Sequence, residues 1–163
     1  RWWPAQGSVR RGKCGPNPTD RGRCGSKLNV MTDPRGTPLA VIVSGANEHD
    51  VKFILPLVFM MLPRIGGLPG RPRQYPRQVR ADQGYTSQDL LDLFAACGIE
   101  AEIPQRGDEA PKGLGKRRWP VERAISWHKQ YRRIGTRRDR KLTNYNSFIT
   151  LASALIAFKQ LVF

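Results

Sequence analysis

The sequence predicts a mixed α/β domain in which a sheet of short strands is covered by helices. Apolar runs of strand length alternate with segments of helical periodicity after an antiparallel start, and this order is typical of such layered folds. The chain of 163 residues has no internal repeat and is long enough to enclose one hydrophobic core. We therefore expect residues 1–163 to form a single domain.

The expected elements follow from periodicity and from turn residues. The predicted strands are apolar or alternating runs bounded by turn signals, at 27–33, 38–44, 78–82 and 99–104. The predicted helices carry an apolar stripe, at 51–62, 88–97, 117–133 and 145–161. Both faces of the run 38–44 are apolar, which favours a central strand. We expect Pro56 to kink its helix, Pro120 to lie in a first turn, and Gly98 to end a helix.

The N-terminal segment is the least periodic part of the chain. Residues 1–26 are rich in Gly, Pro and Arg, and they predict a basic, loop-rich arm with a candidate first strand at 2–9. Asn47 and Asp50 are candidate caps of the helix that follows the second strand. The three cysteines form no CxxC pair, so we expect reduced thiols in a cytosolic protein, with Cys97 in the core.

The charge balance points to a polyanionic partner. There are 28 Lys and Arg residues against 13 Asp and Glu residues, which gives a formal charge of +15 and a pI of about 10.7. Nucleic acid is the default partner of such a chain, and an anionic membrane surface is second, although the basic residues are spread along the sequence. No run of 18 apolar residues is present, so we expect no membrane span.

Two acidic residues stand out against this basic background. Asp82 ends a predicted strand, and ligands of α/β sheets bind outside the carboxyl ends of strands. Glu122 lies near the start of a basic helix, where pairing with Arg118 or Ser126 at four-residue spacing is one interpretation. The other interpretation is a metal site, because Mg²⁺ binds one or two protein carboxylates and shares phosphate oxygens and water.

The chain resembles the catalytic domain of bacterial insertion-sequence DDE transposases of the insertion-sequence-five type. The resemblance covers nearly the whole chain and is carried by an ordered series of motifs, namely GPNPTDRG at 15–22, GSK at 25–27, PLA at 38–40, GAN at 45–47 with His49-Asp50, GRPR at 70–73, ADQGY at 81–85, RWPVER at 118–123 and Arg132-Arg133. The resemblance implies a ribonuclease-H-like mixed sheet with helices on both faces. It also implies DNA strand cleavage and transfer at the ends of an insertion element.

The same resemblance assigns roles to individual residues. Asp82 matches the second catalytic acid and Glu122 the third, and both would bind Mg²⁺ or Mn²⁺, with two ions if the triad is complete. The family's arginine and lysine around the glutamate are kept as Arg118 and Lys129, whereas Gly115 replaces an expected tyrosine. The basic residues expected to contact DNA are Arg118, Arg123, Lys129, Arg132 and Arg133.

The first acid of the triad is not assigned: either the chain has lost it or the first strand is rearranged, with Asp20 and Asp33 as the nearest acids. Relatives carry it a few residues before a Val-Arg pair, and here Ala5 or Gln6 stands at that place ahead of Val9-Arg10. Two functions are therefore open, an active DNA transposase domain and a catalytically dead DNA-binding remnant. In both, the expected partner is transposon and target DNA in the bacterial cytoplasm, associated with the nucleoid, with a homo-oligomer forming on that DNA. A third hypothesis is a basic structural or RNA-binding protein, but no RRM-like or KH-like motif supports it.

Overall fold

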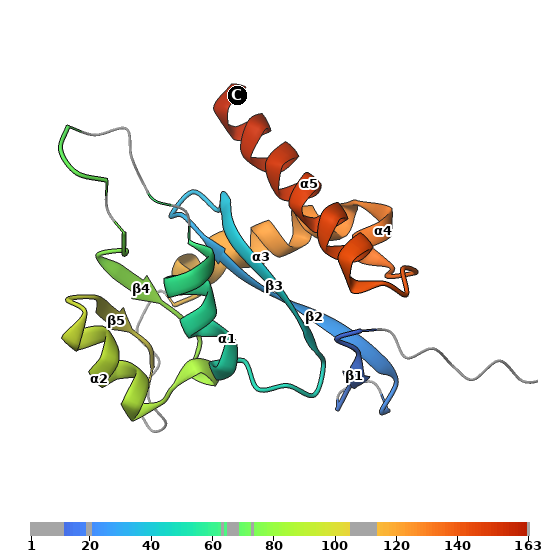
Figure 1. Cartoon of the computed structure of the whole chain (residues 1–163), viewed down its shortest axis with the longest axis horizontal. Helices are drawn as coiled ribbons and strands as arrows, with labels where there is room; N and C mark the ends of the chain where they lie inside the picture. Colours follow the sequence, from blue (N-terminus) through green and yellow to red (C-terminus); the bar gives the residue numbers. More distant parts are fainter. Residues whose placement is uncertain are drawn as a thin grey trace, which may run out of the picture.

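The structure is a computed structural model that describes residues 12–18, 21–62, 64, 69–72, 74–104 and 114–162, without the side chains of 114–118 and 162. Its strands are β1 (Gly15–Pro16), β2 (Cys24–Thr32), β3 (Pro38–Gly45), β4 (Gln78–Arg80) and β5 (Glu100–Glu102). Its helices are α1 (Val51–Leu55), the π-helical η1 (Pro56–Met61), the 3₁₀ turn η2 (Gln83–Tyr85), α2 (Gln88–Ala96), α3 (Leu114–Gln130), α4 (Arg132–Gly135) and α5 (Leu142–Val162) (Figure 1). The mixed α/β class is confirmed.

The described strands form two separate sheets where the sequence predicted one mixed sheet. β1, β2 and β3 are antiparallel neighbours, and β4 pairs in parallel with β5. β4 and β5 can pair in parallel because α2 lies between them in the chain and provides the crossover connection that parallel strands need. The candidate first strand at 2–9 lies outside the described residues, as does Ala5 or Gln6 within it.

The β2–β3 hairpin separates two hydrophobic cores. Val41 and Val43 belong to a core formed with α4 and α5, where Tyr145 and Ile149 are buried. Met31 packs against the other core, which contains residues of α1, η1, β4, α2 and β5. Since neighbouring residues of a strand point to opposite faces, the hairpin is covered on both sides, and Figure 1 shows α3 crossing it. β3 is an apolar strand as predicted, but it is not central among the described strands: in the order β1-β2-β3 it lies at the edge and β2 is central.

Two predicted helix signals act as expected. The chain leaves α-helical geometry at Pro56, where α1 passes into η1. Gly98 adopts a φ of +68° directly after the end of α2, a conformation that glycine reaches without strain. Cys97, by contrast, is an exposed free thiol and not part of the core. It occupies the cap position of α2, where the side chain faces outward.

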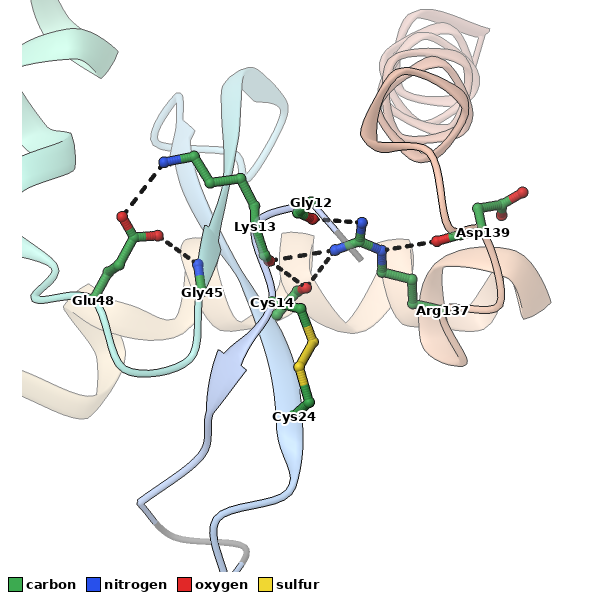
Figure 2. Close-up of a disulfide and its surroundings, with 9 residues drawn as sticks. Gly12, Lys13, Cys14, Cys24, Gly45, Glu48, Arg137 and Asp139 are labelled. Carbon is green, nitrogen blue, oxygen red and sulfur yellow. Dashed lines mark hydrogen bonds and ion pairs between the residues drawn. A yellow bond between two sulfur atoms is a disulfide. The ribbon is translucent and has the colours of Figure 1, made fainter. Parts of the chain in front are cut away.

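The described part of the N-terminal arm is held in place and is not a free loop. Cys14 and Cys24 form a disulfide, with a Cα–Cα distance of 5.7 Å, so the expectation of reduced thiols is corrected for this pair. Antiparallel pairing of β1 with β2 brings the two cysteines together. Lys13 forms an ion pair of 3.4 Å with Glu48, whose carboxylate also accepts from the Gly45 N–H at 2.6 Å (Figure 2). That backbone hydrogen bond, more than the cations nearby, lowers the pKa of Glu48.

Arg137 fastens the arm to the C-terminal half of the chain. Its guanidinium donates to the carbonyl oxygen of Gly12 at 2.7 Å and to that of Lys13 at 3.3 Å, and also to the Ser26 hydroxyl. Figure 2 shows it between the arm and the segment that carries Asp139. The Arg137 guanidinium also lies over the Tyr145 ring at 4.7 Å. One side chain thus connects β2, the arm and α5.

The helix predicted at 117–133 begins earlier and ends earlier. α3 starts at Leu114, so Pro120 lies inside the helix and not in its first turn. The helix stops at Gln130, and Tyr131 leads into α4. Gly135 lies so close to α3 that a Cβ there would be 2.4 Å from the Lys129 carbonyl oxygen. Only glycine fits this junction, which sets the direction of the chain after α3.

The terminal helix α5 is longer than predicted and only partly buried. Tyr145, Ile149, Ala152 and Ile156 face the interior. The opposite side exposes large apolar side chains, namely Leu151, Leu155, Phe158 and Leu161. Among the described helices, none has the length and apolar character needed to cross a membrane.

Candidate active site

Asp82 is positioned by the end of β4. The backbone N–H of Ala81 donates to the Glu102 carbonyl oxygen at 3.3 Å, so pairing with β5 continues to the residue before Asp82. Asp82 then caps η2: its side chain accepts from the Gln83 N–H at 2.7 Å, and its carbonyl oxygen from the Tyr85 N–H at 2.9 Å. Asp82 is exposed, at the carboxyl end of a strand as predicted, and its orientation is fixed by the turn it caps.

A second carboxylate lies near this turn. A Cβ on Gly84 would lie 3.8 Å from the Asp50 carboxylate, which places Asp50 beside η2. Burial raises the pKa of Tyr85 to about 12, and the negative charges of Asp50 and then Asp82 add to this effect. Asp50 occupies the N-cap position of α1, but its side chain makes no capping hydrogen bond and instead forms an ion pair with Lys27. The expected capping role of Asp50 is therefore replaced by a position at the candidate site.

A contact between Tyr85 of η2 and Asn29 of β2 links the turn that carries Asp82 to the β1–β2–β3 sheet. The Tyr85 hydroxyl lies 3.5 Å from Oδ1 of Asn29, which is buried on β2. Nδ2 of Asn29 donates to the Ser44 hydroxyl at 2.9 Å. Buried polar groups of this kind are retained where they are hydrogen-bonded. The sequence offered no signal for this chain of contacts beyond the proximity of Tyr85 to Asp82.

Glu122 is exposed on α3, as the sequence predicted. Residues seven apart on a helix differ by about 20° in direction, so Lys129 shares the Glu122 face. The backbone of Arg118, one turn earlier, lies on the same face, but the Arg118 side chain is outside the described part. Among the described side chains, none forms an ion pair with Glu122, and Ser126 makes no hydrogen bond to it. The described residues therefore give no intrahelical partner for this carboxylate.

The orientation of α3 is set by its buried face. Ala124 and His128 are fully buried, and Nδ1 of His128 lies 2.7 Å from the Ala124 carbonyl oxygen. Nε2 lies 2.9 Å from the hydroxyl of Ser153 on α5. Burial lowers the pKa of His128, and the hydrogen bond to Ala124 opposes this effect. The neutral ring thus links α3 to α5 from the side of α3 that faces away from Glu122.

Arg123 has contacts inside the fold that the sequence did not reveal. Its guanidinium stacks on Trp119 at 3.8 Å and on Trp127 at 4.8 Å. It also donates to the carbonyl oxygen of Arg35 in the turn between β2 and β3. These contacts fasten α3 to the hairpin. The proposed DNA contact of Arg123 stays a prediction, as does that of every basic residue assigned from the sequence.

The basic residues after Glu122 are at the surface. Lys129, Arg132 and Arg133 are all exposed. Arg133 forms an ion pair of 3.6 Å with Asp139 and lies over the Phe148 ring at 4.6 Å. Its guanidinium is therefore partly engaged, whereas Lys129 and Arg132 extend the exposed basic surface at the end of α3.

The two carboxylates predicted to bind a metal ion have the right chemistry for a hard divalent cation, but they are fewer than three. Asp82 and Glu122 supply carboxylate oxygens, the ligands that Mg²⁺ prefers. Within the described residues, no three His, Cys, Asp or Glu side chains converge on one point. A metal site shared by Asp82 and Glu122 therefore stays a prediction from the sequence.

The amino-acid sequence of the chain matches known proteins. Residues 3–157 match the family model described as "Transposase DDE domain". The chain is similar to a protein of Burkholderia cepacia named "Putative transposase for insertion sequence element IS402", with 46% identity over 151 residues. That alignment covers 93% of this chain and 71% of the relative. No solved structure matches the chain.

Proposed function

Because the chain belongs to the transposase DDE domain family, we propose that it is a DNA transposase catalytic domain that cleaves and transfers DNA strands at element ends. The proposal includes a ribonuclease-H-like fold, which the hairpin covered on both faces and the parallel β4–β5 pair support. The observation that carries it is the place of Asp82, fixed at the carboxyl end of β4 by its capping hydrogen bond.

In this proposal, Asp82 and Glu122 hold Mg²⁺ or Mn²⁺, as one ion or as part of a two-ion site. An ion held by these two carboxylates would supply activation of a water or a 3′-hydroxyl and stabilisation of the leaving oxygen in phosphoryl transfer. Asp82 is presented by a turn and Glu122 by a rigid helix, which limits how far either carboxylate moves. The Glu122 side of α3 is where the scissile phosphate would lie.

The basic surface binds the DNA backbone. Arg118 lies one turn before Glu122 on α3, whereas Lys129, Arg132 and Arg133 follow it along α3 and α4. Neutralising phosphates with such groups releases counterions, so binding weakens steeply as salt rises. We place the protein on DNA in the bacterial cytoplasm. We also propose a homo-oligomer on DNA, since the uncharged stripe of α5 is where two chains of charge +15 meet with least repulsion.

A second function is favoured by one specific feature of the sequence. Ala5 or Gln6 stands where relatives carry the first acid, so the chain has two of three expected carboxylates. In that case it is a DNA-binding remnant that retains the surface of the enzyme without the reaction. The two functions share every DNA contact and differ only in cleavage.

A nicking assay on terminal-repeat duplex DNA with Mn²⁺ separates them. The active enzyme nicks as wild type and loses nicking in Asp82→Asn and Glu122→Gln. The remnant does not nick as wild type but gains nicking in Ala5→Asp or Gln6→Asp. Asp89→Asn, which removes an exposed acid on α2, is the matched control and should change neither outcome. Absence of nicking in wild type and in both gain-of-acid variants would refute the site.

A further inference from the structure

A groove of about 500 Å³ lies between α3, α5 and the turn that joins β2 to β3. The turn is tied to α5, because the Thr37 hydroxyl donates to Oε1 of Gln160 at 2.6 Å. The groove is on the Arg123 side of α3, and Arg123 is about 100° around the helix from Glu122. It is therefore distinct from the face that carries the proposed metal ligands, yet adjacent to it.

The groove is cationic, and none of its described lining residues is acidic. Arg35, Arg123 and Lys159 all line it, whereas its other described lining residues are uncharged. None of the three takes part in an ion pair between described residues. Nε of Arg123 is buried without a hydrogen-bond partner. A buried N–H without a partner costs free energy, so Arg123 is held beside the groove at some cost in stability.

Aromatic rings lie beside these cations. Trp127 and Tyr131, four residues apart, both line the groove and are partly exposed. The amide side chains of Gln130 and Gln160 also line it. Cations beside exposed rings are the usual platform for single-stranded nucleic acid, because rings stack on bases while cations hold phosphates. Amides can hydrogen-bond the edges of an unpaired base.

We propose that this groove binds an unpaired nucleotide of DNA. The phosphate lies at Arg35 and Lys159, and the base lies against Trp127 and Tyr131. The proposal rests on the DNA transposase function above and adds a site for a strand that has left the duplex near Glu122. An acidic peptide would satisfy the cations, but it would make no use of the rings and amides together.

The test uses a single-stranded oligonucleotide that carries 2-aminopurine, whose fluorescence falls when it stacks on a ring. Lys159→Gln should weaken binding about three- to tenfold, and Trp127→Leu about tenfold with loss of the quenching, as one stacked base contributes about 1–3 kcal/mol. Lys141→Gln removes the same charge at the far end of α5 and should weaken binding less. Lys159 is exposed, so that variant is expected to fold even if Trp127→Leu does not.

Three outcomes would overturn the proposal. The first is an equal loss of affinity in Lys159→Gln and Lys141→Gln together with unchanged quenching in folded Trp127→Leu. The second is binding of polyglutamate in preference to the oligonucleotide. The third is wild-type nicking and duplex binding without any single-strand binding, which would leave the proposed function intact. Failure of duplex binding with retained single-strand binding would instead refute the proposed function and leave the groove in place.

Discussion

Nε2 of His128 on α3 lies 2.9 Å from Oγ of Ser153 on α5, and this partly buried contact links the two helices. The Ala124 carbonyl oxygen can only accept, so Nδ1 carries a proton and Nε2 is the acceptor of the neutral ring. Because α3 presents Glu122, the protonation state of His128 affects how firmly the candidate site is held.

The free energy of unfolding should decrease as the pH is lowered below the ordinary pKa of histidine. Burial lowers the pKa of His128 from 6.5 in the folded chain, so the folded state binds this proton more weakly than the unfolded state. The contribution of neutral His128 to the free energy of unfolding is complete above about pH 6.5 and is lost progressively as the pH falls below that value. Urea unfolding of the wild type and of His128→Gln across this range measures it. The variant should be less stable by about 1–3 kcal/mol at neutral pH and show a shallower slope. An equal slope would exclude His128 as the cause.

The pKa of Tyr85 should report the two carboxylates beside η2. It is raised to about 12 by burial first, then by Asp50 and then by Asp82. Asp50→Asn should therefore lower it more than Asp82→Asn, and in both variants burial should keep it above 10. Titration of tyrosinate absorbance, with Tyr85→Phe to identify the signal, measures these values. A larger effect of Asp82→Asn would show that the carboxylates are arranged differently.

Loss of Arg137 should release the N-terminal arm. Its guanidinium holds two carbonyl oxygens and the Ser26 hydroxyl, so Arg137→Ala should cost about 1–3 kcal/mol of unfolding free energy. Hydrogen exchange should rise in residues 12–18 and 24–26. Arg138→Ala removes an exposed neighbouring arginine and serves as the control. Unchanged exchange in Arg137→Ala would mean that the disulfide alone orders the arm.

Reduction of the Cys14–Cys24 bond should destabilise the purified protein. The bond closes a loop with a sequence separation of 10, for which chain entropy predicts about 2–3 kcal/mol. Unfolding with and without reductant measures the difference, and the double variant Cys14→Ser, Cys24→Ser should not respond to reductant. A response of similar size in the double variant would trace the effect to Cys97.

The elements that were predicted correctly depend on local signals. β3 is a continuous apolar run, Pro56 and Gly98 act through their own backbone geometry, and Asp82 follows a strand that ends in a turn. Each of these is decided by a few neighbouring residues. The placement of Asp82 and of Glu122 on their elements was therefore within reach of the sequence, although their roles stay predictions.

The features that were missed depend on distant parts of the chain. Arg137 contacts a segment more than a hundred residues away, and the Cys14–Cys24 bond needs the β1–β2 register. In the sequence Arg123 is indistinguishable from the other cations of a basic run. In the structure it stacks on two tryptophans and donates a hydrogen bond to the hairpin turn. The sequence predicts Asp50 to be a helix cap, whereas in the structure it lies beside η2. No local pattern distinguishes these residues from ordinary surface charges.

Metal binding tests the central claim that Asp82 and Glu122 form one divalent site. In a Mn²⁺ titration followed by NMR, paramagnetic broadening should begin at the amides of Asp82, Gln83 and Glu122. It should be lost in Asp82→Asn and Glu122→Gln and kept in Asp89→Asn. Broadening that persists in the first two variants, or that starts away from both residues, would contradict the claim.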